Sequence, residues 1–451
     1  MSDDSDVPAR RQPAIAAARS APPPTSTIPA SNSSPSRTVT NSGRRAPPRS
    51  DWRSTFDSLA NRNFLYLWLG MLFMMGGMQM QMIARGYLAY ELTSSPFLLG
   101  VVNSGFAVPL LALSLFGGAF ADRLERKYII QFGQGMSAAL AIIIGVAIYF
   151  DVVTWFHLWI ASIIQGALFS FLMPARQAII PQLVGQERLS NAMALNAAAM
   201  SATTLAAPAL AGWAYAYLGA YNVYYIIAGL AVIAFALTGL IPRAGTGAGR
   251  RPAPMIGDII DGLVYIKRSP LVLILLLMGL ATALLAMPFR FLMPIFIVDV
   301  YRMGPEAMGL LVTIMGGGSL VGSLFIASLG KSGRGMLLII GSFISGVTLL
   351  LVAIIPNYVI AAVLMLPLGL GDAGRRTLNQ SLIMEEVEDR YRGRVMSVFM
   401  LNFGLMPLGV LPAGTAAEYI GGQAVVGILA VMLLGVTTLI LLTQKRLREM
   451  A

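Results

Sequence analysis

Cysteine is absent from this 451-residue sequence, and histidine occurs once, at His157. The absence of cysteine excludes disulfide bonds, cysteine-ligated zinc and a cysteine nucleophile, and one histidine cannot build a histidine cluster around a metal. No phosphate-binding loop is complete either, because Phe325 occupies the position of the first glycine before Gly330-Lys331-Ser332. We therefore expect a protein with no resident metal or cofactor and with no enzymatic activity.

Charged residues are also scarce. They make up 12% of the chain, where about 25% is usual for soluble proteins, and 56% of the residues are hydrophobic. The mean hydropathy is +0.72. A surface this apolar cannot stay in water, so the composition predicts an integral membrane protein whose partner is the lipid bilayer.

The net charge of +11 has two explanations. A soluble protein of this charge would be a candidate for binding nucleic acid, whereas a membrane protein gathers Lys and Arg in its cytoplasmic loops. The placement of the basic residues, described below, favours the second explanation. We expect no nucleic-acid partner.

Residues 1–58 differ from the rest in being rich in Ser, Pro, Ala and Arg. Too few apolar side chains are present to offset the entropy of ordering, so we predict a disordered tail. A secretory signal needs an apolar run soon after a basic start, and no apolar run comes before Phe64, so we expect no secretory signal and a tail that stays in the cytoplasm.

Long apolar runs predict the fold. A spanning helix needs about 20 largely apolar residues. Twelve such runs occur, near 64–89, 97–120, 128–150, 155–176, 190–218, 221–241, 271–298, 307–329, 335–355, 358–378, 394–417 and 421–443. We predict an all-α membrane protein with an N-terminal six-helix half at 59–243, a cytoplasmic linker at 244–269, a C-terminal six-helix half at 270–445 and a short cytoplasmic tail at 446–451.

The placement of Lys and Arg supports this count. Nearly all of them fall in the termini and in loops that join even-numbered to odd-numbered spans. The loops that join odd-numbered to even-numbered spans hold one basic residue, Arg302. This bias predicts that both termini are cytoplasmic and that the protein lies in the cytoplasmic membrane.

The two halves share a repeat with an offset of 209 residues. Pro96-Phe-Leu-Leu-Gly100 matches Pro305-Glu-Ala-Met-Gly309, and each segment opens the second helix of its half. Parallel halves related by an axis normal to the membrane place a substrate cavity on that axis. The repeat therefore predicts a pseudo-symmetric transporter.

The link between the second and third spans carries glycine, acidic and basic residues at short spacings. These are Gly118, Asp122, Arg123, Arg126 and Lys127. The basic residues could pair with the acidic cluster at 385–389 when a cytoplasmic mouth closes, and an ordinary basic loop is the alternative. The segment resembles the signature loop of the major facilitator superfamily, although Glu125 stands where many members have glycine.

Two further segments resemble one branch of that superfamily, the branch that contains the enterobactin exporter. They run from Pro174 to Ala192 and from Arg392 to Gly409.

Pro208 and Gly212 in the fifth span are similar to a motif of drug-proton antiporters, with Ala207 in place of its glycine. The resemblance implies a helix-5 hinge and export, and a kink needed only for packing is the alternative.

Polar side chains inside the spans are candidates for binding substrate, because intramembrane charge is costly and usually faces a cavity. They are Gln81, Arg85, Asn103, Gln165 and Arg290. For both arginines the alternative is a side chain that extends to the membrane interface. For Gln165 it is an interhelical hydrogen bond.

Asp372 is the carboxylate that we place well inside a span, and it is our candidate for proton coupling. The alternative is a structural ion pair with Arg375 or Arg376, three and four residues further along the helix.

These features together predict a monomeric secondary transporter with two rocking halves. The predicted activity is proton-coupled export of a small amphipathic drug or siderophore-like metabolite. An importer on the same fold and a non-transporting membrane sensor are the alternatives.

Overall fold

The computed structural model describes residues 58–242, 255–328 and 333–448, with further gaps at individual side chains, 114–123 and 401–404 among them. The predicted tail at 1–58 lies outside these ranges except for Ser58, which is buried and hydrogen-bonded to Asn191 and to the carbonyl oxygen of Arg188. The first part of the predicted linker also lies outside them. All of the regular elements within them are helices.

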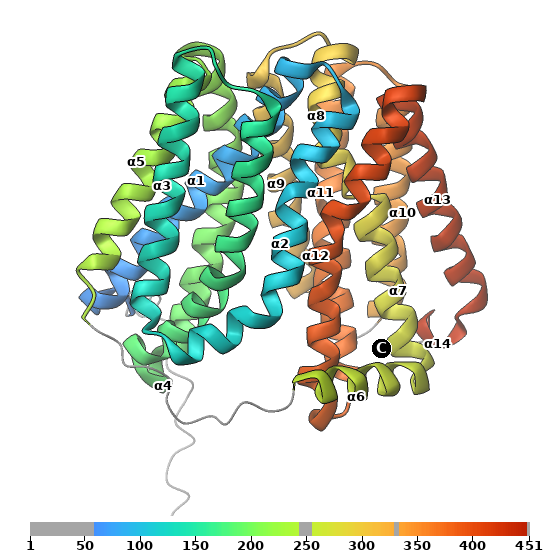
Figure 1. Cartoon of the computed structure of the whole chain (residues 1–451). Helices are drawn as coiled ribbons and strands as arrows, with labels where there is room; N and C mark the ends of the chain where they lie inside the picture. Colours follow the sequence, from blue (N-terminus) through green and yellow to red (C-terminus); the bar gives the residue numbers. More distant parts are fainter. Residues whose placement is uncertain (1–57, 243–254, 329–332, 449–451) are drawn as a thin grey trace, which may run out of the picture. The chain divides into compact units, whose positions relative to one another are not determined.

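Five helices make up the first half of the described chain (Figure 1). The side-chain oxygen of Asn61 caps the first of them by accepting from the backbone N–H groups of Asn63 and Phe64. The helices are α1 (Arg62–Thr93), α2 (Pro96–Arg123), α3 (Arg126–Tyr149), α4 (Trp155–Leu218) and α5 (Ala220–Gly239). Within α4, Gly185 has a φ of 71°, which breaks the helix into two spans, Trp155–Gly185 and Glu187–Leu218. The half therefore holds six spans, as predicted.

The second half begins with an interrupted span. Its three pieces are α7 (Pro270–Leu285), α8 (Pro288–Ile295) and a π-helical turn, η2 (Phe296–Val300). Proline cannot donate a backbone hydrogen bond, so Pro288 starts a new helix just after α7 ends. The remaining spans are α9 (Pro305–Ser328), α10 (Arg334–Ile354), α11 (Tyr358–Glu386), α12 (Asp389–Ile420) and α13 (Gly422–Thr443), and the short α14 (Lys445–Arg448) follows.

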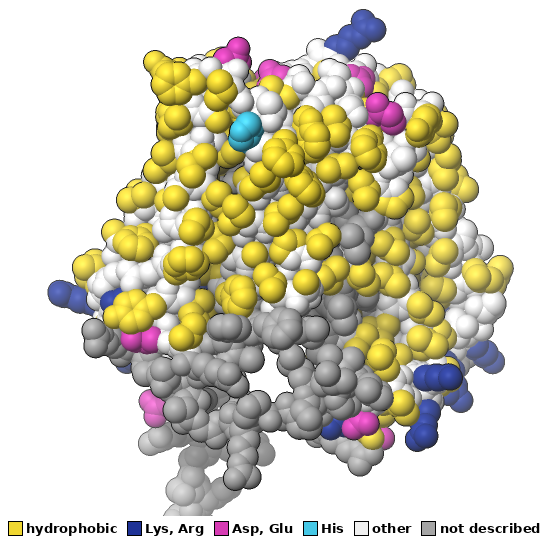
Figure 2. All heavy atoms as spheres, in the orientation of Figure 1, with side chains coloured by type: hydrophobic (Ala, Val, Ile, Leu, Met, Phe, Trp, Pro, Cys, Tyr) yellow, Lys and Arg dark blue, Asp and Glu magenta, His cyan; other side chains and the backbone are white. Residues whose placement is uncertain are grey.

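Among the described residues, eleven helical segments are long and apolar enough to cross a membrane. The twelfth predicted span, 394–417, lies within α12, where several side chains fall outside the description. On the face in Figure 2, hydrophobic side chains cover the spanning part, and charged side chains gather towards its two ends. Large exposed apolar residues such as Leu277 and Leu439 suit a hydrocarbon surface.

The predicted polar linker proved to be partly helical. Its second part forms α6 (Met255–Arg268), which lies across the ends of the spanning helices (Figure 1). Tyr265 stacks on Tyr391 of α12 with ring centroids 4.3 Å apart, and Asp261 accepts an ion pair from Arg394 at 3.1 Å. Ile266 is buried. The charged residues of this segment predicted a polar linker, and the apolar face that packs on α12 was not predicted.

The two halves meet closely at one end of the bundle. We call this the distal end, because it lies opposite the proximal end, which carries the start of α1, α6 and α14 (Figure 1). Here α4 packs on α9, and α2 packs on α12. A Cβ on Gly212 would lie 2.5 Å from the carbonyl oxygen of Pro305 and 3.0 Å from the Cα of Gly309.

The second contact repeats the first. A Cβ on Gly414 of α12 would lie 2.6 Å from the carbonyl oxygen of Pro96 and 3.3 Å from the Cα of Gly100. The Pro-to-Gly repeat found in the sequence therefore supplies one side of each contact, and glycine on the facing helix supplies the other. Only glycine permits backbones to approach this closely.

Replacing Gly212 by alanine is expected to open the distal end, because its Cβ cannot fit against Pro305. We expect the distally closed state to lose about 1–3 kcal/mol, the usual cost of overpacking. The measurement is the distance between spin labels at Tyr217→Cys and Met303→Cys. Both side chains are exposed, and the chain has no native cysteine to compete for the label.

Gly229→Ala in α5 is the matched control, since a Cβ there meets nothing within 4 Å. If Gly212→Ala and Gly229→Ala give the same distance distribution, close glycine packing does not hold the distal end shut.

Candidate functional site

A cavity of about 160 Å³ lies among helices α1, α2, α4 and α8. Its α1 side is formed by residues spaced three and four apart, which places them on one face of the helix. The lining consists of Met78, Gln79, Gln81, Met82, Arg85, Asn103, Phe106, Leu110, Gln165 and Phe291. The structure thus brings together four of the five predicted binding residues, Gln81, Arg85, Asn103 and Gln165.

Two of these polar residues are hydrogen-bonded to each other across the helices. The Nε2 of Gln165 donates to the Oε1 of Gln81 at 2.5 Å, and both side chains are buried. The Nδ2 of Asn103 donates to the carbonyl oxygen of Leu99 at 3.0 Å, which leaves the amide oxygen of Asn103 available. The hydrogen bond considered as the alternative for Gln165 exists, and it holds the amide at the cavity wall.

Arg85 is 6% exposed and lies inside the protein, so it does not extend to a membrane interface. Its Nε has no hydrogen-bond partner among the described residues, and neither does the hydroxyl of Tyr224, which lies within electrostatic range of Arg85. A buried guanidinium that opens onto a cavity can bind a polar or anionic group that enters there.

Arg290 lies in α8 beside Phe291, which lines the cavity, but Arg290 itself is not part of the lining. It lies within electrostatic range of Asp372 and Arg376 in α11. Asp372 accepts from Arg375 at 2.6 Å and from Arg376 at 2.5 Å. The ion pairs considered as the alternative for Asp372 are therefore present. Its role in proton coupling stays a prediction.

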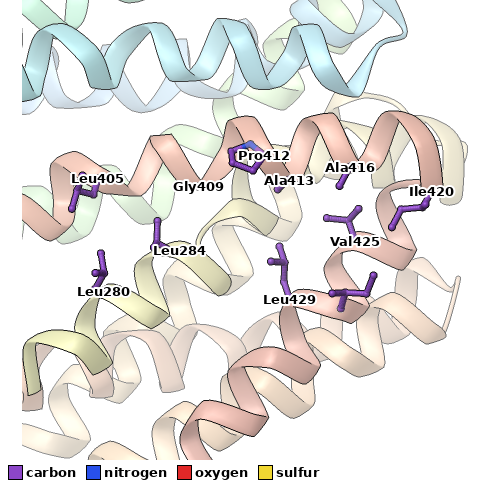
Figure 3. Close-up of a pocket in the computed structure, with 11 residues that line it drawn as sticks. Leu280, Leu284, Leu405, Gly409, Pro412, Ala413, Ala416, Ile420, Val425 and Leu429 are labelled. Carbon is purple, nitrogen blue, oxygen red and sulfur yellow. The ribbon is translucent and has the colours of Figure 1, made fainter. Parts of the chain in front are cut away.

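A larger cavity of about 440 Å³ lies between α7, α12 and α13 (Figure 3). Every side chain around it is apolar. Leu280 and Leu284 come from α7, Pro412 and Ala416 from α12, and Val425 and Leu429 from α13 (Figure 3). A site without a polar side chain cannot fix the orientation of a substrate, so the smaller, polar cavity is the candidate site.

The predicted cytoplasmic gate lies at the proximal end. The side chains of Gly118, Asp122 and Arg123 fall outside the described residues. Arg126 donates to the carbonyl oxygen of Ala178 at 3.0 Å, and Lys127 donates to those of Gly239 and Ile241 at 2.8 and 2.5 Å. These bonds tie the loop to its own half, and pairing with the acidic cluster at 385–389 stays a prediction.

A set of polar contacts that was not predicted from the sequence joins the halves at the distal end. The hydroxyl of Tyr90 donates to a carboxylate oxygen of Asp299. Glu418 accepts from the hydroxyl of Ser95 at 2.8 Å and from the backbone N–H of Phe97 at 3.1 Å. Tyr90 and Asp299 lie 209 residues apart, the offset of the repeat. Two equivalent positions contact each other when both lie at a pseudo-twofold axis. The repeat in the sequence could therefore have predicted the contact between Tyr90 and Asp299.

Comparison with known proteins adds the family. A model described as the Major Facilitator Superfamily matches residues 67–410, and it matches again at 280–449. The chain belongs to the Major Facilitator Superfamily. This membership confirms the resemblance carried by the loop motifs and the predicted fold of two six-helix halves.

Several relatives in the superfamily are bacterial transporters. The staphyloferrin A transporter of Staphylococcus aureus is 25% identical, over 78% of this chain and 88% of its own length. Macrolide efflux protein A of Streptococcus pyogenes is 25% identical, over 76% and 86%. The enterobactin exporter of Salmonella typhi is 25% identical, over 73% and 83%.

The fold is also that of solved transporters. The crystal structure of the nucleoside transporter NupG matches with a TM-score of 0.67 at 15% identity, over 85% of this chain and 99% of that one. The family and the relatives identify the protein as a secondary transporter of the superfamily, and the solved structure supports the fold.

Replacing Glu418 by alanine is expected to loosen the distal end of this transporter. The change removes the contacts with Ser95, which precedes α2, and with the backbone N–H of Phe97 in α2. We expect a loss of about 1 kcal/mol from the closed state, roughly a fivefold change in the ratio of closed to open molecules. Spin labels at Leu92→Cys and Tyr419→Cys, both exposed, report the separation.

Asp151→Ala serves as the control, because it removes an exposed distal carboxylate that lies in a turn within one half. An unchanged distance in Glu418→Ala would show that this carboxylate does not help to close the distal end.

Proposed function

We propose that this protein exports a small amphipathic molecule across the cytoplasmic membrane by alternating access, with proton entry as the driving force. The proposal rests on a polar cavity that is lined by residues of both halves. The close contacts between the halves that are described above all lie at the distal end. Alternating access needs a site between two rocking halves and a closure that can be released.

The distribution of Lys and Arg supports an orientation with both termini in the cytoplasm. In that orientation the distal end faces away from the cytoplasm. The structure then represents a state closed towards the outside, the state from which an exporter would take up its substrate. We propose that the protein works as a monomer, because one chain supplies both halves of the cavity.

Export is favoured over import by the names of two relatives, a macrolide efflux protein and an enterobactin exporter. These names, with that of the staphyloferrin A transporter, favour a drug or a siderophore-like metabolite as substrate. The cavity supports an amphipathic molecule, since Met82, Phe106 and Phe291 offer apolar contacts beside Gln81 and Arg85.

Two further roles belong to the proposal. Gly118, Asp122, Arg123, Arg126 and Lys127 would form the cytoplasmic gate that closes when the distal contacts open. Pro208 and Gly212 would let α4 bend as that happens. Both lie where α4 meets α9, since a Cβ on Gly309 would contact the carbonyl oxygen of Pro208 and the Cα of Gly212. A helix that lacks one backbone hydrogen bond bends there at low cost.

The direction of transport is tested in a host that lacks its own exporters. Expression is expected to confer resistance to some member of a panel of macrolides and catecholate or carboxylate siderophores, and Arg85→Met is expected to abolish it. Everted vesicles with an acidic interior should then accumulate that compound. Accumulation only in intact cells would favour import, and no effect on any panel member would contradict the export of these compounds.

Proton coupling through Asp372 is tested with Asp372→Asn. The amide keeps the shape of the side chain but cannot exchange a proton, so proton-driven accumulation is expected to fall to background. Exchange of labelled for unlabelled substrate without a gradient is expected to persist. Proton-driven accumulation at the wild-type level would contradict the assignment, and loss of both activities would support the structural ion pair with Arg375 and Arg376. Asp151→Asn is the matched control.

A further inference from the structure

The charges around the cavity carry an inference about the substrate, which rests on the proposed function only in taking this cavity as the substrate site. We propose that the cavity selects organic anions. Arg85 binds the charged oxygens, the apolar body lies among Met82, Phe106 and Phe291, and Arg290 offers a second positive charge from the other half.

Arg85 lacks a counter-charge. Among the residues that the structure describes, no carboxylate forms an ion pair with it. Its Nε is buried without a hydrogen-bond partner. An isolated buried charge is strongly unfavourable unless a partner compensates it. Since the protein supplies no such partner in the described part, the group that compensates Arg85 is expected to come with the ligand.

Asp372, which lies within electrostatic range of Arg290, is engaged in two other ion pairs. Its two carboxylate oxygens accept from Arg375 and from Arg376. Arg290 is therefore left without an ion pair within the described ranges, and its Nε is also unpartnered. The region between the halves thus carries more positive than negative charge, which attracts anions and repels cations.

The repeat indicates that Arg290 is oriented towards the axis. With the offset of 209 residues, Arg290 corresponds to Gln81, and Phe291 corresponds to Met82. Gln81, Met82 and Phe291 all line the cavity. Arg290 therefore occupies, in its own half, the position from which Gln81 reaches the cavity in the other half. A movement of the halves that widens the cavity would bring Arg290 to its edge.

The other lining groups agree with an anion that carries an apolar body. Gln81 Oε1 already accepts from Gln165, and the residues that line the cavity include no carboxylate that could pair with a cationic head group. The thioethers and the aromatic rings provide contacts that adapt to different shapes. With about 160 Å³, the cavity is below the 300–1,000 Å³ usual for ligand sites, so the state described here admits a compact body such as a fused pair of rings.

The test uses two probes of similar shape and opposite charge, 2-naphthalenesulfonate and a 2-naphthyltrimethylammonium salt. Binding of each to the purified full-length protein is measured by equilibrium dialysis at constant ionic strength. We expect the sulfonate to bind at least about tenfold more tightly than the ammonium ion. Arg85→Gln is expected to weaken sulfonate binding about tenfold, because a charge-assisted hydrogen bond is lost. Arg85→Lys is expected to retain the preference for the anion.

Arg290→Gln, combined with Arg85→Gln, is expected to abolish the preference. Arg302→Gln is the control, since this arginine is exposed in the loop after η2 and should not affect either probe. Equal binding of the two probes, tighter binding of the ammonium ion, no binding of either, or sulfonate binding that is unchanged in Arg85→Gln would overturn the proposal. Dialysis requires neither transport nor a proton gradient, so failure of export in vesicles would leave this result intact and would count against the proposed function alone.

Discussion

Hydrocarbon offers no hydrogen-bond partners, and the rest of this structure depends on that constraint. Each spanning segment must satisfy its own backbone, so the described chain is helical throughout the membrane, and breaks occur only where helices surround them. The interruption between α7 and α8 is of this kind, whereas Gly185 is exposed and separates two spans. The same constraint makes each buried polar side chain costly, which is why the few that occur between the halves identify the functional region.

A pseudo-twofold relationship determines how the halves meet. Pro96 to Gly100 and Pro305 to Gly309 provide equivalent surfaces, and each is contacted by a glycine of the opposite half. Tyr90 and Asp299 are equivalent in sequence and contact each other. Two copies of the glycine contact bring the halves together at one end of the molecule, where a single apolar core includes residues of both halves. Transport by alternating access requires that this closure can be released.

Much of the fold could be predicted from the sequence, because each span must be apolar over about 20 residues and Lys and Arg gather on one side. Four polar residues of the cavity, Gln81, Arg85, Asn103 and Gln165, were also predicted because they stand out in apolar runs, and Gln79 was not. The docking of α6 could not be found in this way, because it depends on Tyr265 stacking on Tyr391, more than 100 residues further along the chain. The distal carboxylates were missed because Asp299 and Glu418 lie at span ends, where charge is ordinary.

Arg85 and Asp372 show why an intramembrane charge must be interpreted through its neighbours. Both are polar residues within spans, and by sequence alone both were candidates for function. The structure gives Asp372 two arginine partners, so a proton that binds it must compete with two ion pairs. It gives Arg85 none in the described chain, so a ligand that binds Arg85 displaces no ion pair. Arg85 is therefore the stronger candidate for direct contact with substrate. Asp372 can influence the site through Arg290. The carboxylate offsets the positive charge of Arg290 only in part, because Arg375 and Arg376 share the same carboxylate.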